Sequence, residues 1–225
     1  MNRPEALRDR REIDVMKFIL HFVLCVMLTF AGFCTSAQQE TCTLKKDKDG
    51  IKVYACHSDT AQLKSVRAEV LLENTTLELL KAHILDIDNY VTWQYKMLKA
   101  DVLESVSDSE VIMRTVVDTP WPASNREVIS QLMAKENALG VLEITGKVIP
   151  YDYPPEKGLV RVPFSESAWT VTEINGTDLK VQYVLRVNPG GSLPLWLINL
   201  AVAEGPYQSF RNLKAQLIGT VPADR

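Results

Sequence analysis

"VDTPWPASNREVIS", residues 117–130, interrupts a region in which strand-like runs otherwise follow one another closely. Two prolines, Pro120 and Pro122, flank Trp121, and an Asn-Arg-Glu triplet comes soon after them. Pro122 brings no backbone N–H, so it is tolerated at a strand edge or a corner but not inside a hydrogen-bonded ladder. The stretch therefore predicts a rigid aromatic corner between two strands.

The sequence on both sides of this corner consists almost wholly of strand-like runs, from Leu98 to Asn188. Short turns join these runs in pairs: residues 98–107 with 109–118 around Asp108, 125–136 with 140–150 through residues 137–140, and 158–174 with 178–188 at Asn175-Gly176. Asn-Gly is a strong hairpin dipeptide because both residues accept positive φ angles. Strands that follow one another through short turns predict an antiparallel meander.

Two different patterns precede this meander. Residues 66–73 alternate in the manner of a half-buried strand, with one apolar face formed by Val66, Ala68, Val70 and Leu72. The period then becomes helical, with apolar residues at Leu77, Leu80, Ile84 and Ile87. Thr75 or Thr76 can cap the start of this helix.

A long amphipathic helix follows the last strand. Gly190 and Gly191 end the strand, and Pro194 occupies a position where a first-turn proline is favoured. The helix has an apolar face formed by Leu197, Leu200, Phe210, Leu213 and Leu217, and Gly205-Pro206 must bend it. The predicted fold class is α+β, with a curved antiparallel sheet wrapped around this C-terminal helix.

The N-terminal 37 residues read as an extension followed by a secretion signal. Lys17 precedes an uncharged run from Phe18 to Phe33, and small residues, Thr35-Ser36-Ala37, follow it. The run is short for a spanning helix, but an uncleaved membrane anchor and a buried helix remain as alternatives. Met16 would be a better start for such a signal than Met1. We predict cleavage after Ala37, export to the periplasm or the medium, and one domain over residues 38–225.

Composition limits the classes of partner. The full chain has a net charge of −3, and removal of residues 1–37, with five basic and four acidic side chains, leaves −4. A mildly acidic domain has no bulk attraction for nucleic acid, so no nucleic-acid partner is expected. Its length suits one domain with a sizeable core, and we expect a monomer.

Cys42 and Cys56 form an even pair around the turn signal Asp49-Gly50. A hairpin folded there brings the two cysteines close to cross-strand positions, so we predict a disulfide in an oxidising compartment. Two free thiols or a metal site are the alternatives, but neither a further cysteine nor a nearby histidine pair supports a metal. We therefore expect no bound metal.

Four motifs resemble a known family. Residues 121–127 ("WPASNRE"), 148–162 ("VIPYDYPPEKGLVRV") and 188–199 ("NPGGSLPLWLIN") resemble the START domain, the lipid-transfer module of the Bet v 1-like helix-grip superfamily. Residues 85–94 ("LDIDNYVTWQ") are similar to the family's helix-then-tryptophan signature. Each motif alone is weak, but four in this order and spacing, within a resemblance over about residues 41–218, are specific.

The resemblance implies a U-shaped antiparallel sheet around the C-terminal helix, enclosing a tunnel for one hydrophobic ligand, usually a lipid or sterol. It implies no catalysis and no cofactor. Trp121 and Pro122 would form the corner between adjacent strands. Arg126 and Glu127 would start the next strand, where the family usually has Arg-Asp, either near the ligand or as an ion pair with no ligand role.

Some lipid-binding members of the family have a buried charged pair on the strands near this corner. The corresponding positions here are Met113 and Leu132, so the resemblance predicts that a comparable pair is absent. Arg114 and Arg161 are then the alternatives for contacting a polar head group, although a solvated strand residue is the favoured interpretation of each, because arginine is rarely buried without a partner.

The remaining candidates for the cavity wall are large or apolar residues. On the C-terminal helix and the body they are Trp93, Met113, Leu132, Trp169, Tyr183, Trp196, Leu200 and Ala203. An apolar face is packed core more often than cavity wall, so only about half of this set is expected to touch a ligand. The C-terminal helix is the candidate lid, with Gly190-Gly191 as its hinge and Gly205-Pro206 as a weak point.

Three functions fit these features. The first is non-enzymatic binding of a lipid or other hydrophobic small molecule, as carrier or sensor, with transient membrane contact during loading. The second is an interaction module whose cavity is filled by its own side chains. The third is a cavity enzyme of the cyclase or hydrolase type. The mature chain has only His57 and His83 as histidines, and no catalytic motif includes them, so we predict no enzyme activity.

Overall fold

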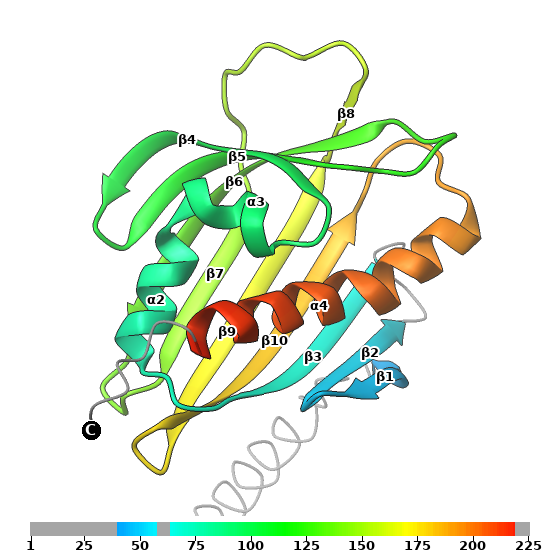
Figure 1. Ribbon diagram of the computed structural model, residues 1–225. Coiled ribbons are helices and arrows are strands. Elements are labelled where there is room, and N and C mark those ends of the chain that lie inside the picture. The colour runs from blue at the N-terminus through cyan, green and yellow to red at the C-terminus, as the bar shows by residue number, and fades with distance from the viewer. Residues whose placement is uncertain (1–39, 58–63, 219–225) are drawn as a thin grey trace, which may run out of the picture. The chain divides into compact units, whose positions relative to one another are not determined.

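The computed structural model describes residues 40–57 and 64–218, and the predicted signal segment lies outside these residues. One sheet of ten strands forms the body of the domain (Figure 1). The strands are β1 (Thr41–Lys48), β2 (Ile51–His57), β3 (Lys64–Leu72), β4 (Met97–Ser107), β5 (Glu110–Val117), β6 (Asn125–Glu136), β7 (Leu142–Val148), β8 (Leu159–Arg161), β9 (Phe164–Ile174) and β10 (Asp178–Asn188). Nine of them lie in the order β1-β2-β3-β10-β9-β7-β6-β5-β4, and β8 pairs with β6.

The helices lie over one face of this sheet. They are α2 (Leu77–Leu85), the 3₁₀ turn η2 (Ile87–Asn89), α3 (Tyr90–Trp93) and α4 (Leu195–Ile218). Thr76 is the N-cap of α2, because its side chain accepts a hydrogen bond from the backbone N–H of Leu79. Figure 1 shows α4 crossing the strands, as the resemblance implies. Within the described ranges, no helix is both long and apolar enough to cross a bilayer.

The helices and the concave face of the sheet share one apolar core. Its fully buried members include Ile51 on β2, Leu80 on α2, Trp93 on α3, Leu179 on β10 and Leu213 on α4. Because these residues come from both ends of the chain, the core closes only when β3 pairs with β10. The predicted helix-grip arrangement is therefore confirmed: the sheet is curved and antiparallel apart from β8, and the C-terminal helix is packed against it.

The local hairpins are also confirmed. Residue Asn175 has a φ of 59° and Gly176 a φ of 74°, as a tight turn between β9 and β10 requires. The turns at Asp108 and at residues 137–140 likewise join β4 to β5 and β6 to β7.

The expectation of one continuous strand over residues 158–174 is wrong. Pro163 separates β8 from β9, because it cannot donate a backbone hydrogen bond to a neighbouring strand. Short β8 instead pairs in parallel with the start of β6, with Glu127 opposite Arg161. The predicted antiparallel meander is otherwise confirmed, since β4, β5, β6, β7, β9 and β10 lie side by side in chain order, and β10 then pairs with β3.

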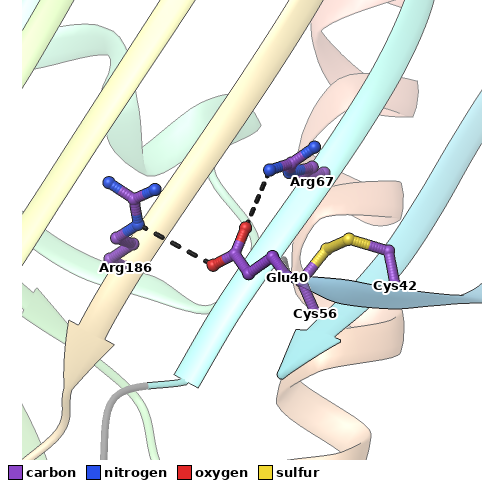
Figure 2. Close-up of a disulfide and its surroundings, with 5 residues drawn as sticks. All are labelled: Glu40, Cys42, Cys56, Arg67 and Arg186. Carbon is purple, nitrogen blue, oxygen red and sulfur yellow. Dashed lines mark hydrogen bonds and ion pairs between the residues drawn. A yellow bond between two sulfur atoms is a disulfide. The ribbon is translucent and has the colours of Figure 1, made fainter. Parts of the chain in front are cut away.

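Cys42 and Cys56 form the predicted disulfide (Figure 2). They are directly opposite each other in the β1–β2 register, with an S–S distance of 2.02 Å. The carboxylate of Glu40 lies next to this bond, but the two sulfurs are bonded to each other and offer no thiolate to a metal ion. Glu40 is instead paired with Arg67 at 2.8 Å and Arg186 at 3.9 Å.

We predict that replacing both Cys42 and Cys56 by serine lowers the free energy of unfolding by about 3 kcal/mol, because the disulfide closes a short loop in the unfolded chain. Urea denaturation with and without a reducing agent measures this effect. The double variant is the control, since its midpoint should not respond to the reducing agent. An equal midpoint for the oxidised and reduced wild-type protein would contradict the prediction.

Candidate ligand cavity

A cavity of about 220 Å³ lies between α3, α4 and the inner face of the sheet. Its wall is mainly apolar and includes residues from β3, β9, β10 and both helices. The lining residues are Val66, Trp93, Gln94, Tyr95, Trp169, Tyr183, Leu185, Val187, Ala201, Val202, Gly205, Pro206, Ser209 and Phe210. The lining residues Gly205 and Pro206 lie within α4, which is continuous from Leu195 to Ile218, so the position at which the sequence predicts a bend is part of the cavity wall.

An aromatic cluster forms one side of the cavity. Trp169 on β9 and Tyr183 on β10 face each other across the two strands, with ring centroids 5.1 Å apart. Phe210 of α4 contacts both rings, at 5.0 and 5.5 Å. The edge-to-face geometry of these pairs stabilises the position of α4 on the sheet.

The sequence prediction of cavity residues is only partly matched by the structure. Trp93, Trp169 and Tyr183 line the cavity. Leu132 and Met113 belong to or pack against the core and do not line it.

On α4 the structure places two candidates on the outside. Trp196 is 54% exposed and Leu200 is 40% exposed, and Ala203 is half-buried but also absent from the wall. The helix turns these positions away from the sheet, while Val202 and Phe210 face it. The sequence reasoning missed Leu185 and Val187, although both share the face of Tyr183 by strand alternation and could have been found from it.

The corner is present between β5 and β6. Trp121 is 89% exposed, and its peptide bond to Pro122 is cis. The backbone N–H of Thr119 donates to the side chain of Asn125, so the loop is held at the start of β6. The predicted interruption of the ladder at Pro122 is confirmed.

Arg126 and Glu127, next to this corner, do not pair with each other. Adjacent residues of a strand point to opposite faces, so their side chains diverge. The Arg126 guanidinium donates to the backbone carbonyls of Ser124, Pro189 and Gly190, and burial lowers the pKa of Arg126. Arg126 therefore fixes the loop that leads into α4.

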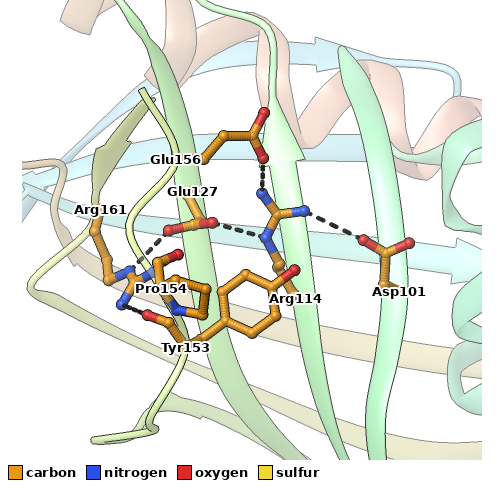
Figure 3. Close-up of polar contacts among 7 residues, drawn as sticks. All are labelled: Asp101, Arg114, Glu127, Tyr153, Pro154, Glu156 and Arg161. Carbon is orange, nitrogen blue, oxygen red and sulfur yellow. Dashed lines mark hydrogen bonds and ion pairs between the residues drawn. The ribbon is translucent and has the colours of Figure 1, made fainter. Parts of the chain in front are cut away.

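Glu127 is the centre of a buried ion cluster on β5, β6 and β8 (Figure 3). Its two carboxylate oxygens accept hydrogen bonds from Arg114 Nε and Arg161 Nε, both at 2.7 Å. Glu127 is 1% exposed and Arg114 3% exposed, so the pair is almost completely removed from water. This pair is not the cavity pair considered in the sequence analysis, because the two positions expected for that pair are the uncharged Met113 and Leu132, which belong to or pack against the core.

The same arginines hold the loop between β7 and β8. Arg114 donates to Glu156 at 2.6 Å and lies over the ring of Tyr153, 5.1 Å from its centroid. Arg161 donates to the backbone carbonyls of Tyr153 and Pro154. Asp101 on β4 is a further partner of Arg114, at 3.3 Å. The "YDYPPEKG" motif, residues 151–158, is thus held on the sheet by its ion pair, hydrogen bonds and cation–π contact with these two arginines.

This cluster lies on the face of the sheet opposite the core. Val111 and Leu132 are directly across from each other and belong to the core. Arg114 is three residues from Val111 and Glu127 five residues from Leu132, and odd spacings in a strand place side chains on opposite faces. Arg114 and Arg161 therefore do not reach the cavity, contrary to their candidacy for a polar head group, and Arg114 is not a solvated strand residue either.

The ionisation of Glu127 follows from these contacts. Burial by itself raises the pKa of this carboxyl, but the hydrogen bonds and charges of Arg114 and Arg161 outweigh burial, so the net shift of the pKa is downward. Glu127 is therefore a carboxylate at neutral pH, and its lowered pKa means that ionisation stabilises the fold.

Comparison with known proteins agrees with this geometry. A model of the START-domain family matches residues 34–217. The chain belongs to the START family. An uncharacterized protein of Pseudomonas aeruginosa is 28% identical over 207 residues, which cover 89% of this chain and 98% of that protein. The mouse phosphatidylcholine transfer protein is 23% identical over 185 residues, covering 78% and 86% of the two chains.

A solved structure has the same fold. The STAR-related lipid transfer protein from Xanthomonas axonopodis superposes with a TM-score of 0.71 and 28% identity, covering 79% of this chain and 98% of that one. START membership confirms the helix-grip fold and indicates binding or transfer of a lipid or other hydrophobic ligand as the general activity of this chain.

We predict that Glu127→Gln lowers the free energy of unfolding by about 3 kcal/mol, because it removes the buried carboxylate that Arg114 and Arg161 share, while the remaining partners of Arg114 are half-exposed. Glu156→Gln is the matched control. Its side chain is 48% exposed, so the expected loss is about 0–1 kcal/mol. Urea denaturation at pH 7 measures both values, and equal losses in the two variants would refute the role assigned to Glu127.

The stability difference between wild type and Glu127→Gln should also depend on pH. Because the pKa of Glu127 is lowered on folding, its contribution is fully present above the usual carboxyl value of 4.5 and is lost as the pH falls through the lowered pKa. The stability difference between wild type and Glu127→Gln should therefore shrink below about pH 4.5.

Proposed function

We propose that this chain binds a lipid or another hydrophobic small molecule in the cavity beneath α4, without catalysing a reaction, and acts as a carrier or sensor. START membership supports the ligand class. The observation that supports the site most directly is the mainly apolar, partly open cavity between α4 and the sheet. Each Å² of apolar ligand surface buried there would contribute roughly 25 cal/mol.

Loading requires α4 to move. The cavity of about 220 Å³ is smaller than the roughly 300–1,000 Å³ typical of ligand sites, so a ligand of usual size does not fit with α4 in this position. Two features support a lid motion about the loop before α4. The first is the pair Gly190 and Gly191 in that loop, whose φ angles are 67° and 59°. The second is Pro206 within α4, which donates no backbone hydrogen bond and so weakens the helix at that point. A transient membrane contact of a monomer is the setting we propose for this exchange.

The alternatives have less support. An enzyme needs an acid, a base or a nucleophile at its reacting centre, whereas the described wall of the cavity has no aspartate, glutamate, histidine, lysine, arginine or cysteine. His83 lies outside the wall, packed against Trp93 with ring centroids 5.7 Å apart. A side-chain-filled interaction module remains the second candidate, because the cavity is small.

We predict that the purified protein contains an extractable hydrophobic adduct. Native mass spectrometry before and after organic extraction measures it. Val187→Phe should reduce the occupancy at least about ten-fold, because the added ring occupies the cavity. Val184→Phe is the control, since it lies on the opposite face of the same strand. A clean mass together with no uptake from a mixed lipid panel would favour the filled module.

We further propose that the chain is exported. The disulfide between Cys42 and Cys56 supports an oxidising compartment. The expected result is a mature N-terminus at Gln38, measured by N-terminal sequencing of the protein from the cell envelope or the medium. Retention of residues 16–37 on a membrane-bound protein would instead favour the uncleaved anchor.

A further inference from the structure

The wall of the cavity beneath α4 is uncharged throughout. Its polar side chains are Gln94, Tyr95, Tyr183 and Ser209, and the other ten lining residues have no polar side chain apart from the indole of the two tryptophans. Three arginines of the sheet, on β5, β6 and β8, are engaged outside this wall. Arg114 and Arg161 are bound to Glu127 on the opposite face of the sheet, and Arg126 donates to three backbone carbonyls outside the wall.

A charged head group would therefore be poorly accommodated. A phosphate or an ammonium group loses its hydration on entering such a cavity, and only a partner charge or several good hydrogen bonds offset that loss. The described wall has no counter-charge for either sign. The interaction that charged lipids need is absent from the site that would hold them.

Tyr183 provides a different kind of contact. It lies between Trp169 and Phe210, it keeps part of its surface accessible, and it lines the cavity. The phenol of Tyr183 is protonated at physiological pH and can donate a hydrogen bond, and burial raises its pKa further above the usual value. Tyr183 interacts electrostatically with Tyr90, whose hydroxyl donates to the carbonyl of Ile84, and no hydrogen bond of the Tyr183 hydroxyl is found among the described residues.

Ser209 adds a second donor on the facing helix. Its Oγ accepts a hydrogen bond from the backbone N–H of Tyr95 at 3.0 Å, which leaves its own proton free to donate. The cavity thus combines apolar walls with neutral hydroxyl groups, one on β10 and one on α4. This arrangement suits an uncharged acceptor oxygen on an otherwise hydrophobic molecule.

We propose that the cavity takes a neutral lipid with a hydroxyl, ketone or ester oxygen, which Tyr183 binds, in preference to a phospholipid. This inference rests on the proposed function, and it names the ligand class for the same site. The small volume of the cavity also favours a neutral lipid with one chain or a compact shape, because such a molecule requires less displacement of α4 than a diacyl lipid.

The test compares three ligands with the same oleoyl chain and different head groups: monooleoylglycerol, oleoyl lysophosphatidylcholine and oleoyl lysophosphatidic acid. Competition is measured by native mass spectrometry of the purified protein, below the micelle concentration of each ligand. We expect monooleoylglycerol to bind at least about ten-fold more tightly than either charged lipid. Equal or tighter binding of a charged lipid would overturn the neutral-lipid inference and leave the binding function intact. Binding of none of the three would overturn both.

Tyr183→Phe tests the hydroxyl while keeping the ring in its aromatic cluster. The affinity for monooleoylglycerol should fall by about three- to ten-fold, and the affinity for 1-octadecene, which has no oxygen, should not change. Tyr54→Phe is the matched control, because Tyr54 lies on β2 outside the cavity wall. An unchanged affinity for monooleoylglycerol, or an equal loss for both ligands, would rule out the assigned hydrogen bond.

Discussion

The buried carboxylate of Glu127 is the constraint on which much of this structure depends. A carboxylate that is 1% exposed is stable only when cations and hydrogen bonds replace water, and Arg114 and Arg161 do so from two other strands. To meet this requirement β8 must lie parallel to β6, and the loop of residues 151–158 must follow the arginines across the sheet. One acidic side chain thus positions four segments of the chain.

The ion cluster around Glu127 lies on the outer face of the sheet, and this limits which residues the inner face can present. Because side chains alternate along each strand, residues that satisfy Glu127 cannot also reach the cavity. The inner face is left with apolar and neutral polar groups.

A second set of contacts holds α4 over this face. Lys46 pairs with Glu204 and Tyr207 donates to Asp49, so the β1–β2 hairpin binds the middle of α4. The disulfide at the other end of the hairpin stabilises the strands that make this contact.

Features that depend on neighbours in sequence were predicted well. The Asn175-Gly176 turn, the Thr76 cap and the Cys42–Cys56 pairing each follow from a few consecutive residues or one hairpin register. The partners of Arg126 and Glu127 were not predictable in this way. Arg126 and Glu127 are adjacent in the sequence, but their side chains lie on opposite faces of β6. Glu127 binds arginines of β5 and β8, and Arg126 binds carbonyls of the loop before α4.

The sequence by itself determined the class of fold, the hairpins, the C-terminal helix and the START resemblance, because periodicity, turn residues and motif order are properties of local chain. Only the tertiary structure decided which face each strand presents to α4, which arginines bind Glu127, and which side chains line the cavity. These depend on the pairing of β3 with β10 and of β6 with β8, which join segments far apart in the chain. A one-residue change of register would exchange the two faces, so residue types alone cannot distinguish a charged cavity from a neutral one.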